Sequence, residues 1–374
     1  MTIPSVLQQK EYHSSRVSLT DVLKEDSTDL DSLLLFIVIF QLRSKAGKLR
    51  RSVNFIGLGL FSTCVTMLLI NQTKVAAFLL LGFQNSPVFN QMLFVLFLVL
   101  YILTLLGNLM IIMLVARAQS LRFPMYFFLT QLSLSDILLT TNIAPNMLHV
   151  IIYGGGTISF TACITQLYFH GTSTAAECLL LTVMSYDRYL AICRPLHYTS
   201  IMDLKLQIQL VILCWFTAFP LMLPIVFLID HLQFCGPQII DHYFCDLAPL
   251  LELSCSDYNI VKVVDIVLGI PSALFPFCFI LSTYVYIFIA IFGISSTIGR
   301  QKAFSTCSSH LTVVSTFYGT LIAIYLFPSE GQTSTENKLI SLLYSVGTPF
   351  LNPIIYSLRN QEIRSILLKY ISNA

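Results

Sequence analysis

Long apolar runs recur between residues 92 and 357 of this chain. A helix needs roughly 20 apolar residues to cross the hydrocarbon core of a bilayer, and seven runs reach that length. They lie at 92–115, 126–148, 165–190, 207–229, 260–293, 305–327 and 338–357. Because backbone groups inside lipid must find partners within the protein, each run should be helical. The alternation typical of a membrane barrel does not occur in the runs. The sequence therefore predicts an all-α membrane protein, a seven-transmembrane helix bundle.

The scarcity of charge supports a membrane location and excludes several function classes. Hydrophobic residues make up 56% of the chain and charged residues 11%, against about 25% charged residues in soluble domains. The net charge of +2 comes without a basic stripe, so no nucleic-acid partner is expected. No G-x-S-x-G, H-E-x-x-H or P-loop motif points to an enzyme. A transporter or channel would need inverted repeats or pore-facing charges, and neither is visible.

The basic residues predict the orientation. If the first span runs inward, the inner segments hold ten Lys and Arg residues and the outer segments three. The outer three are Lys74, Lys262 and Lys338. The positive-inside rule then places the N-terminus outside and the C-terminus in the cytoplasm. The same orientation puts the sequon Asn71-Gln72-Thr73 on the lumenal side, so we expect glycosylation at Asn71.

The first 66 residues fit this plan less well. The apolar run 53–70 follows several basic residues, which is typical of a signal peptide or signal anchor. The alternative is that translation begins at Met67, in which case residues 1–66 are an artefact of the gene model. The predicted organisation is an atypical extension at 1–66, an extracellular N-terminus at 67–91, the seven-helix domain at 92–357 and a cytoplasmic tail with a short amphipathic helix at 358–374.

Five motifs, in order and in register with the spans, carry a family resemblance. They are Gly107-Asn108, PMYFFL at 124–129 with LSLSD at 132–136, MSYDRYLAIC at 184–193 with PLHY at 195–198, KAFSTCSSHL at 302–311 and PFLNPIIYSLRN at 349–360. Together they resemble the signatures of odorant receptors, which are rhodopsin-like G-protein-coupled receptors. The resemblance covers about residues 71–370. It implies a multi-pass plasma-membrane receptor that binds a small, largely apolar odorant and activates a stimulatory olfactory G protein, raising cAMP. A chemoreceptor outside the nose that senses a metabolite is the alternative.

The resemblance also assigns roles in G-protein coupling. It implies that Arg188, within Asp187-Arg188-Tyr189, is restrained by Asp187 at rest and freed to meet the G protein on activation. Tyr284 and Tyr356 are similar to the tyrosines that reorganise around this arginine. Tyr356 closes the seventh-helix motif that begins with Asn352 and Pro353. The alternative is that Arg188 only extends its charge to the membrane surface.

Two acids, Asp136 and Glu177, lie deep in the second and third spans. Carboxylates in hydrocarbon are costly unless they are paired, protonated or bound to a cation. The resemblance implies a proton or a sodium ion shared between them, with Asn108 or Asn352 as polar neighbours. A plain hydrogen bond between helices is the alternative. No other metal or cofactor is expected.

The ligand site is expected in the outer half of the spans. His170, Thr174 and Glu177 recur at helical spacing and share one face of the third span, and the resemblance puts the family's cavity beside His170 and Thr174. The other candidates are Leu268, Ser272, Tyr318, Leu321, Ile322 and Tyr325. For each of them, ordinary core packing is the alternative. Aminergic receptors carry an aspartate at the place of His170, and opsins a lysine at that of Val346. Neither an amine transmitter nor retinal is therefore expected.

Four cysteines, Cys163, Cys235, Cys245 and Cys255, lie on the predicted outer side. An oxidising compartment favours disulfides, and four cysteines allow three connectivities. A metal site that includes His242 is the alternative, but the spacings match no common zinc pattern. We predict Cys163–Cys245, which ties the third span to the long outer loop, and Cys235–Cys255 within that loop.

Overall fold

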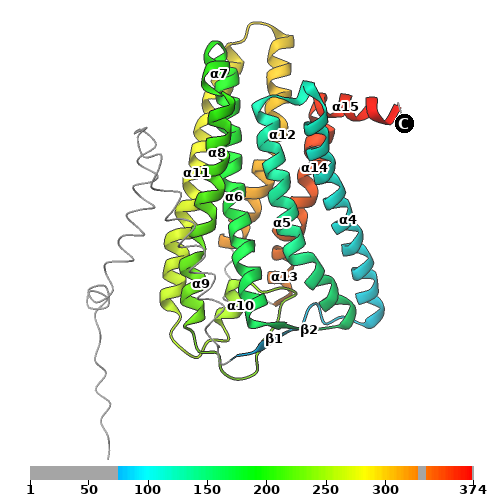
Figure 1. Ribbon diagram of the computed structural model, residues 1–374, viewed down its shortest axis with the longest axis vertical. Coiled ribbons are helices and arrows are strands. Elements are labelled where there is room, and N and C mark those ends of the chain that lie inside the picture. The colour runs from blue at the N-terminus through cyan, green and yellow to red at the C-terminus, as the bar shows by residue number, and fades with distance from the viewer. Residues whose placement is uncertain (1–74, 327–333, 373–374) are drawn as a thin grey trace, which may run out of the picture. The chain divides into compact units, whose positions relative to one another are not determined.

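The computed structural model describes residues 75–326 and 334–372. Long helices make up most of this part, and a small sheet closes one end (Figure 1). Asn71 and the segment 1–66 lie outside the described residues. Glycosylation at Asn71 and both readings of the extension therefore stay predictions.

Every apolar run predicted from the sequence is occupied by helix. The long helices are α4 (Pro87–Arg117), α5 (Pro124–Tyr153), α6 (Phe160–Cys193), α8 (Leu204–Leu221) with α9 (Leu223–Asp230), α11 (Asn259–Gly293), α12 (Thr297–Leu326), and α13 (Ser334–Leu342) followed by the π-helical turn η2 (Leu343–Gly347) and α14 (Thr348–Arg359). The shorter helices are η1 (Gln119–Leu121), α7 (Pro195–Ile201), α10 (Leu247–Leu251) and α15 (Gln361–Ser372).

Within the described residues, four helices are long and apolar enough to cross a membrane. They are Pro87–Arg117, Leu204–Asp230, Asn259–Gly293 and Lys338–Ser357. The helices α5 and α6 instead bury ionisable side chains, including Asp136, Glu177 and Arg188. Such side chains lower the apolar character of a helix. Length and composition thus identify four spans, and the count of seven and the orientation of the ends stay predictions.

The starts of the helices are set by local chemistry rather than by hydropathy. Proline stands in the first turn of α4 and of α5, where its missing N–H costs nothing. The Ser159 hydroxyl accepts a hydrogen bond from the Ala162 N–H at 3.2 Å and caps α6. The Asp203 carboxylate accepts one from the Leu206 N–H at 2.8 Å and caps α8. These helices therefore begin several residues before the apolar runs do.

The sheet was not predicted, and it corrects the all-α expectation. β1 (Ala77–Leu80) pairs antiparallel with β2 (Gly156–Ser159) and parallel with β3 (Ile239–Ile240), in the order β2-β1-β3. It joins the segment before α4, the connection between α5 and α6, and the long loop after α9. Strands of two to four residues are too short to show a period in the sequence. We call this end of the molecule the sheet end.

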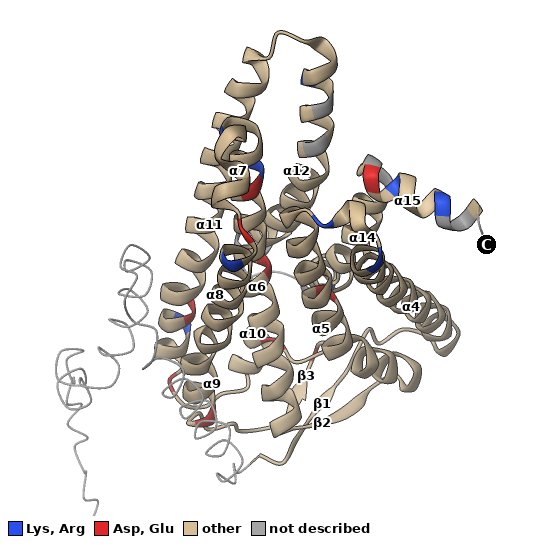
Figure 2. Ribbon diagram, turned by 45° about the horizontal axis from the view of Figure 1, so that its top comes forward, with Lys and Arg blue, Asp and Glu red and all other residues tan. Residues whose placement is uncertain are grey.

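Basic residues gather at the opposite end, which carries α7 and α15 and which we call the α7 end (Figure 2). Two buried apolar clusters fill the interior. One lies towards the α7 end and includes Leu129, Met184 and Tyr356. The other lies towards the sheet end and includes Phe97 and Phe244.

The outward faces of the helices are apolar. Val88 is 69% exposed and Phe292 72%, and many large apolar side chains on α4 and α11 are exposed with them. An apolar surface of this extent is stable against lipid rather than water.

Candidate functional site

The helix α6 carries candidate residues at both ends and in the middle. It packs against α5, α8, α11 and α12, and it runs through the middle of the bundle (Figure 1). From His170 to Arg188 it rises about 27 Å, at 1.5 Å per residue. That is nearly the thickness of a bilayer core. One rigid element thus connects the sheet end with the α7 end.

The two buried acids meet in the centre of the bundle. Asp136 is fully buried and Glu177 nearly so, and their carboxyl groups lie close enough to interact electrostatically. The Asn352 side-chain amide donates to both carboxyl oxygens of Asp136, at 3.1 Å each. The structure therefore brings together three of the residues expected here, from α5, α6 and α14.

The side-chain amide of Asn108 makes a contact that the sequence did not predict. Its side-chain amide donates to the Pro349 carbonyl at 3.2 Å and to the Thr104 carbonyl at 3.1 Å. In a regular helix the Pro349 carbonyl would accept from residue 353, but Pro353 has no N–H. The Asn108 amide thus supplies to the Pro349 carbonyl the donor that Pro353 lacks. A Cβ on the neighbouring Gly107 would lie 3.1 Å from the Pro353 ring, so glycine there permits the close approach of α4 and α14.

Arg188 is buried at the α7 end, with 8% of its surface exposed. Although both side chains are described, Arg188 makes no ion pair with the adjacent Asp187. The Asp187 carboxylate instead accepts a hydrogen bond from the Tyr198 hydroxyl of α7, at 2.8 Å. Burial and the neighbouring Asp187 carboxylate raise the pKa of Tyr198, so this phenol remains a donor.

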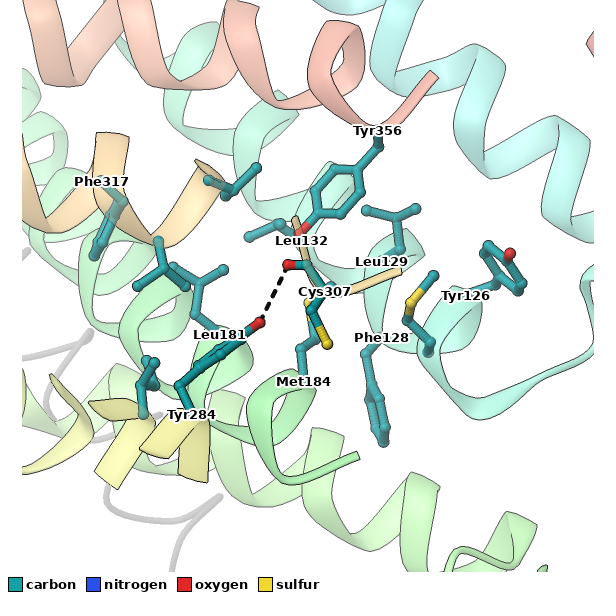
Figure 3. Packing of buried hydrophobic residues seen from close by; sticks show 14 of the residues in the cluster. Tyr126, Phe128, Leu129, Leu132, Leu181, Met184, Tyr284, Cys307, Phe317 and Tyr356 are labelled. Carbon is teal, nitrogen blue, oxygen red and sulfur yellow. Dashed lines mark hydrogen bonds between the residues drawn. The ribbon is translucent and has the colours of Figure 1, made fainter. Parts of the chain in front are cut away.

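The tyrosines named with Arg188 lie in the same apolar cluster. In Figure 3 the side chains of Tyr284 and Tyr356 point toward Cys307 of α12. The Tyr284 hydroxyl bonds the His310 Nδ1 at 2.8 Å and donates to the Cys307 carbonyl at 3.4 Å. The Tyr356 hydroxyl and the Arg188 Nε have no partner in the described part of the chain. His310 lies in the motif at 302–311, but the sequence indicated no role for it. Tyr189 is half-buried and stacks on Tyr186, with ring centroids 6.5 Å apart.

At the α7 end, the C-terminal helix α15 is tied to α5. The Tyr126 hydroxyl donates to the Glu362 carboxylate at 2.5 Å, at the start of α15. The side-chain oxygen of Asn360 accepts from the backbone N–H groups of Glu362 and Ile363. Ile363 is buried and Leu367 half-buried, whereas Glu362, Arg364 and Lys369 are exposed, so α15 is amphipathic. The tie through Tyr126 had no signal in the sequence beyond its motif.

At the sheet end, His170 lies between two aromatic rings. Its ring centroid is 5.5 Å from that of Phe244 and 5.2 Å from that of Tyr344 in η2. Its Nε2 is buried and has no partner among the described residues. The Thr174 hydroxyl donates to the backbone carbonyl of His170 at 3.1 Å. The Nε2 atom of His170 is therefore a buried polar atom without a hydrogen bond, surrounded by aromatic rings.

The remaining pocket candidates lie on α11 and α12, which pack against each other. Tyr318 is 3% exposed and packs on Phe277, with ring centroids 4.8 Å apart. Leu321 and Leu268 are half-buried, and the Ser272 hydroxyl donates to the Gly269 carbonyl at 2.8 Å.

Ile322 is 43% exposed, on the same face of α12 as the exposed Ser315 and Gly319. Its contact with a ligand stays a prediction. Tyr325 lies in the last turn of α12, and its side chain lies outside the described residues.

The long loop after α9 enters the core at the sheet end. The disulfide Cys163–Cys245 joins it to α6, with Cα atoms 5.4 Å apart. The disulfide Cys235–Cys255 closes the loop on itself, with a Cα separation of 5.7 Å. Both are the pairs expected from the sequence, so the cysteines are not free for a metal.

The segment just before Cys245 is buried and was missed by sequence reasoning. His242 is 2% exposed, and Tyr243 and Phe244 are fully buried. The Tyr243 hydroxyl bonds the Ser345 hydroxyl of η2 at 3.2 Å. The Cys245 N–H donates to the Gln166 side chain of α6 at 2.9 Å. The one available signal was the aromatic run beside Cys245, which is unusual in a solvated loop.

Comparison with known proteins agrees with this arrangement. A family model described as olfactory receptor matches residues 97–374. Human olfactory receptor 10A7 is 44% identical over 306 residues, which is 82% of this chain and 97% of that protein. Mouse olfactory receptor 1M1 is 45% identical over 303 residues, 81% of this chain and 96% of its own length. The chain belongs to the olfactory receptor family. This olfactory receptor is a membrane receptor and not an enzyme.

Proposed function

We propose that this olfactory receptor is a seven-span plasma-membrane protein with its N-terminus outside and its C-terminus in the cytoplasm. It binds a small, largely apolar odorant near His170, in the outer half of the bundle. It then activates a stimulatory olfactory heterotrimeric G protein through the region of Arg188, and cAMP rises. The family and the apolar outward faces of the helices support this proposal.

The observation that carries it is the placement of buried, incompletely bonded polar groups along α6. His170 stands at the sheet end, Glu177 in the centre and Arg188 at the α7 end, all on one helix. A ligand that changes the packing around His170 acts on the same rigid element that holds Arg188. Binding shifts a conformational equilibrium by the difference in affinity for the two states.

The proposal also includes the two buried acids Asp136 and Glu177 and the polar side chains near them. Glu177 Oε1, Asn108 Oδ1 and Asn352 Oδ1 are buried oxygens with no donor among the described residues. Oxygen atoms beside the Asp136 carboxyl group are suitable ligands for a hard cation. We assign to this place a sodium ion or a shared proton. When bound, the ion would compensate the buried negative charge and stabilise the packing of α5, α6 and α14.

The test is a cAMP reporter assay in cells that display the receptor, against a chemically broad panel of odorants. A tagged receptor reports surface expression in every well, and cells without receptor give the background. Odorant-dependent cAMP that disappears in Arg188→Ala at equal surface expression supports the proposal. A receptor that reaches the surface and raises no cAMP with any odorant would contradict it.

A further inference from the structure

The loop residue His242 lies in a buried cluster with His170. We define the histidine cluster as His170 of α6, His242, Phe244 and Asp246 of the loop, and Tyr344 of η2. Both imidazole rings meet the Phe244 ring edge-on, with centroids 5.5 Å away for His170 and 4.7 Å for His242. The Tyr344 ring contacts His170, and its hydroxyl donates to the Asp246 carboxylate at 3.4 Å.

Covalent and hydrogen bonds hold this cluster in place from three sides. The Cys163–Cys245 disulfide fixes the loop to α6, two helical turns above His170. The Asp246 carboxylate also accepts from the Leu247 N–H at 2.8 Å and so caps α10. Tyr344 belongs to a π-helical turn, a distortion that occurs frequently at functional sites. The cluster is therefore preorganised.

Three ring nitrogens in this cluster are buried without a partner among the described residues. They are His170 Nε2, His242 Nδ1 and His242 Nε2. Buried polar groups in native proteins almost always have a partner, so each open one requires an explanation. Burial lowers the pKa of His242 to about 4, against the opposing effect of Asp246. His242 is therefore a neutral imidazole at physiological pH, with one donor and one acceptor nitrogen.

We propose that the histidine cluster binds the hydroxyl group of an alcohol or phenol odorant. This rests on the proposed function and names the ligand class. A hydroxyl both donates and accepts, so one group satisfies a ring N–H and a bare ring nitrogen together. A carbonyl or an ether only accepts, and an ammonium only donates. A carboxylate would meet the negative charge of Asp246.

The test compares matched ligands in the cAMP assay: straight-chain and aromatic alcohols of several sizes, each with its methyl ether and the corresponding aldehyde. We expect each active alcohol to be about tenfold or more potent than its ether, because the ether leaves a buried group unpaired. His242→Phe should remove this preference, and His242→Gln, which keeps a donor and an acceptor, should retain part of it. His149→Phe is the matched control, since His149 is an exposed histidine of α5 that also lies near the sheet end.

The outcomes separate this inference from the proposed function. Ethers or aldehydes as potent as the alcohols would overturn the hydroxyl site while the receptor still responds to odorants. An alcohol preference that survives both His170→Phe and His242→Phe, at normal surface expression, would also overturn it and leave the nitrogens to buried water. If His242→Phe fails to reach the surface, the alcohol preference of His242→Gln is compared with that of the original receptor. An undiminished preference in His242→Gln would then overturn the role of His242. A surface receptor silent to the whole panel contradicts both.

Discussion

The pair Lys338–Asp241 joins the first turns of α13 to the loop after β3. The ammonium nitrogen lies 2.6 Å from a carboxylate oxygen, and the side chains are 7% and 46% exposed, respectively. The lysine is therefore the desolvated partner. Asp241→Asn leaves a buried ammonium without its counter-charge, whereas Lys338→Met removes the buried charge and leaves a carboxylate that is 46% exposed.

The two substitutions should therefore differ in their effect on stability. Breaking a fully buried pair on one side costs roughly 3–5 kcal/mol. Solvent screening at the half-exposed Asp241 reduces this to about 2 kcal/mol for Asp241→Asn. Lys338→Met should cost only about 0–1 kcal/mol, because no buried charge remains.

The assay is thermal unfolding of the purified receptor in detergent. Asp241→Asn should lower the melting temperature by about 4 °C, and Lys338→Met by less. Glu252→Gln is the control, since Glu252 is an exposed carboxylate near the same loop. The double variant Asp241→Asn with Lys338→Met should be no less stable than Asp241→Asn alone. Equal losses for the two single variants would refute the assignment of the burial cost to Lys338.

Three further predictions concern the centre and both ends of the bundle. Arg188→Ala should abolish cAMP signalling, because it removes the cation that we assign to G-protein contact, while surface expression stays within about twofold; signalling at the normal level would remove Arg188 from the mechanism. Glu177→Gln should change basal activity or its sodium dependence more than the ranking of agonists; a reordered ranking would place the ligand site deeper than His170. As pH falls from 6.5 towards 4, the unfolded state binds a proton that folded His242 does not. The free energy of unfolding should therefore fall by on the order of 3 kcal/mol in this window, and an unchanged pH profile in His242→Gln would contradict that cause.

Hydropathy predicted the positions of the helices because apolar length is a direct requirement of the bilayer. It could not give their ends, which depend on caps such as Ser159 and Asp203 in the water phase. Residues within a motif, such as Asp136 and Asn352, could be expected to meet because the family resemblance relates one helix to another.

The burial of residues that contact distant segments of the chain, and that belong to no sequence motif, could not be predicted. Lys338 was counted as an outer charge, and only the three-dimensional structure shows that it is buried. The same holds for His242, which a solvated loop would leave exposed. The contacts that hold these places join the long loop to segments about 100 residues away in sequence: Asp241 to Lys338 of α13, and Tyr243, the neighbour of His242, to Ser345 of η2. Such separation leaves no local signal.

The buried polar atoms without partners are not scattered through the described part of the chain. Most gather in three groups along α6: His170 and His242 at the sheet end; Glu177, Asn108 and Asn352 in the centre; and Arg188, His310 and Tyr356 at the α7 end. Each open group costs stability, so a protein retains it where something else completes the bond. We propose a ligand hydroxyl, a cation or proton, and the G protein as the three completions. In that proposal, completing the first group changes the packing of α6, on which the third group depends.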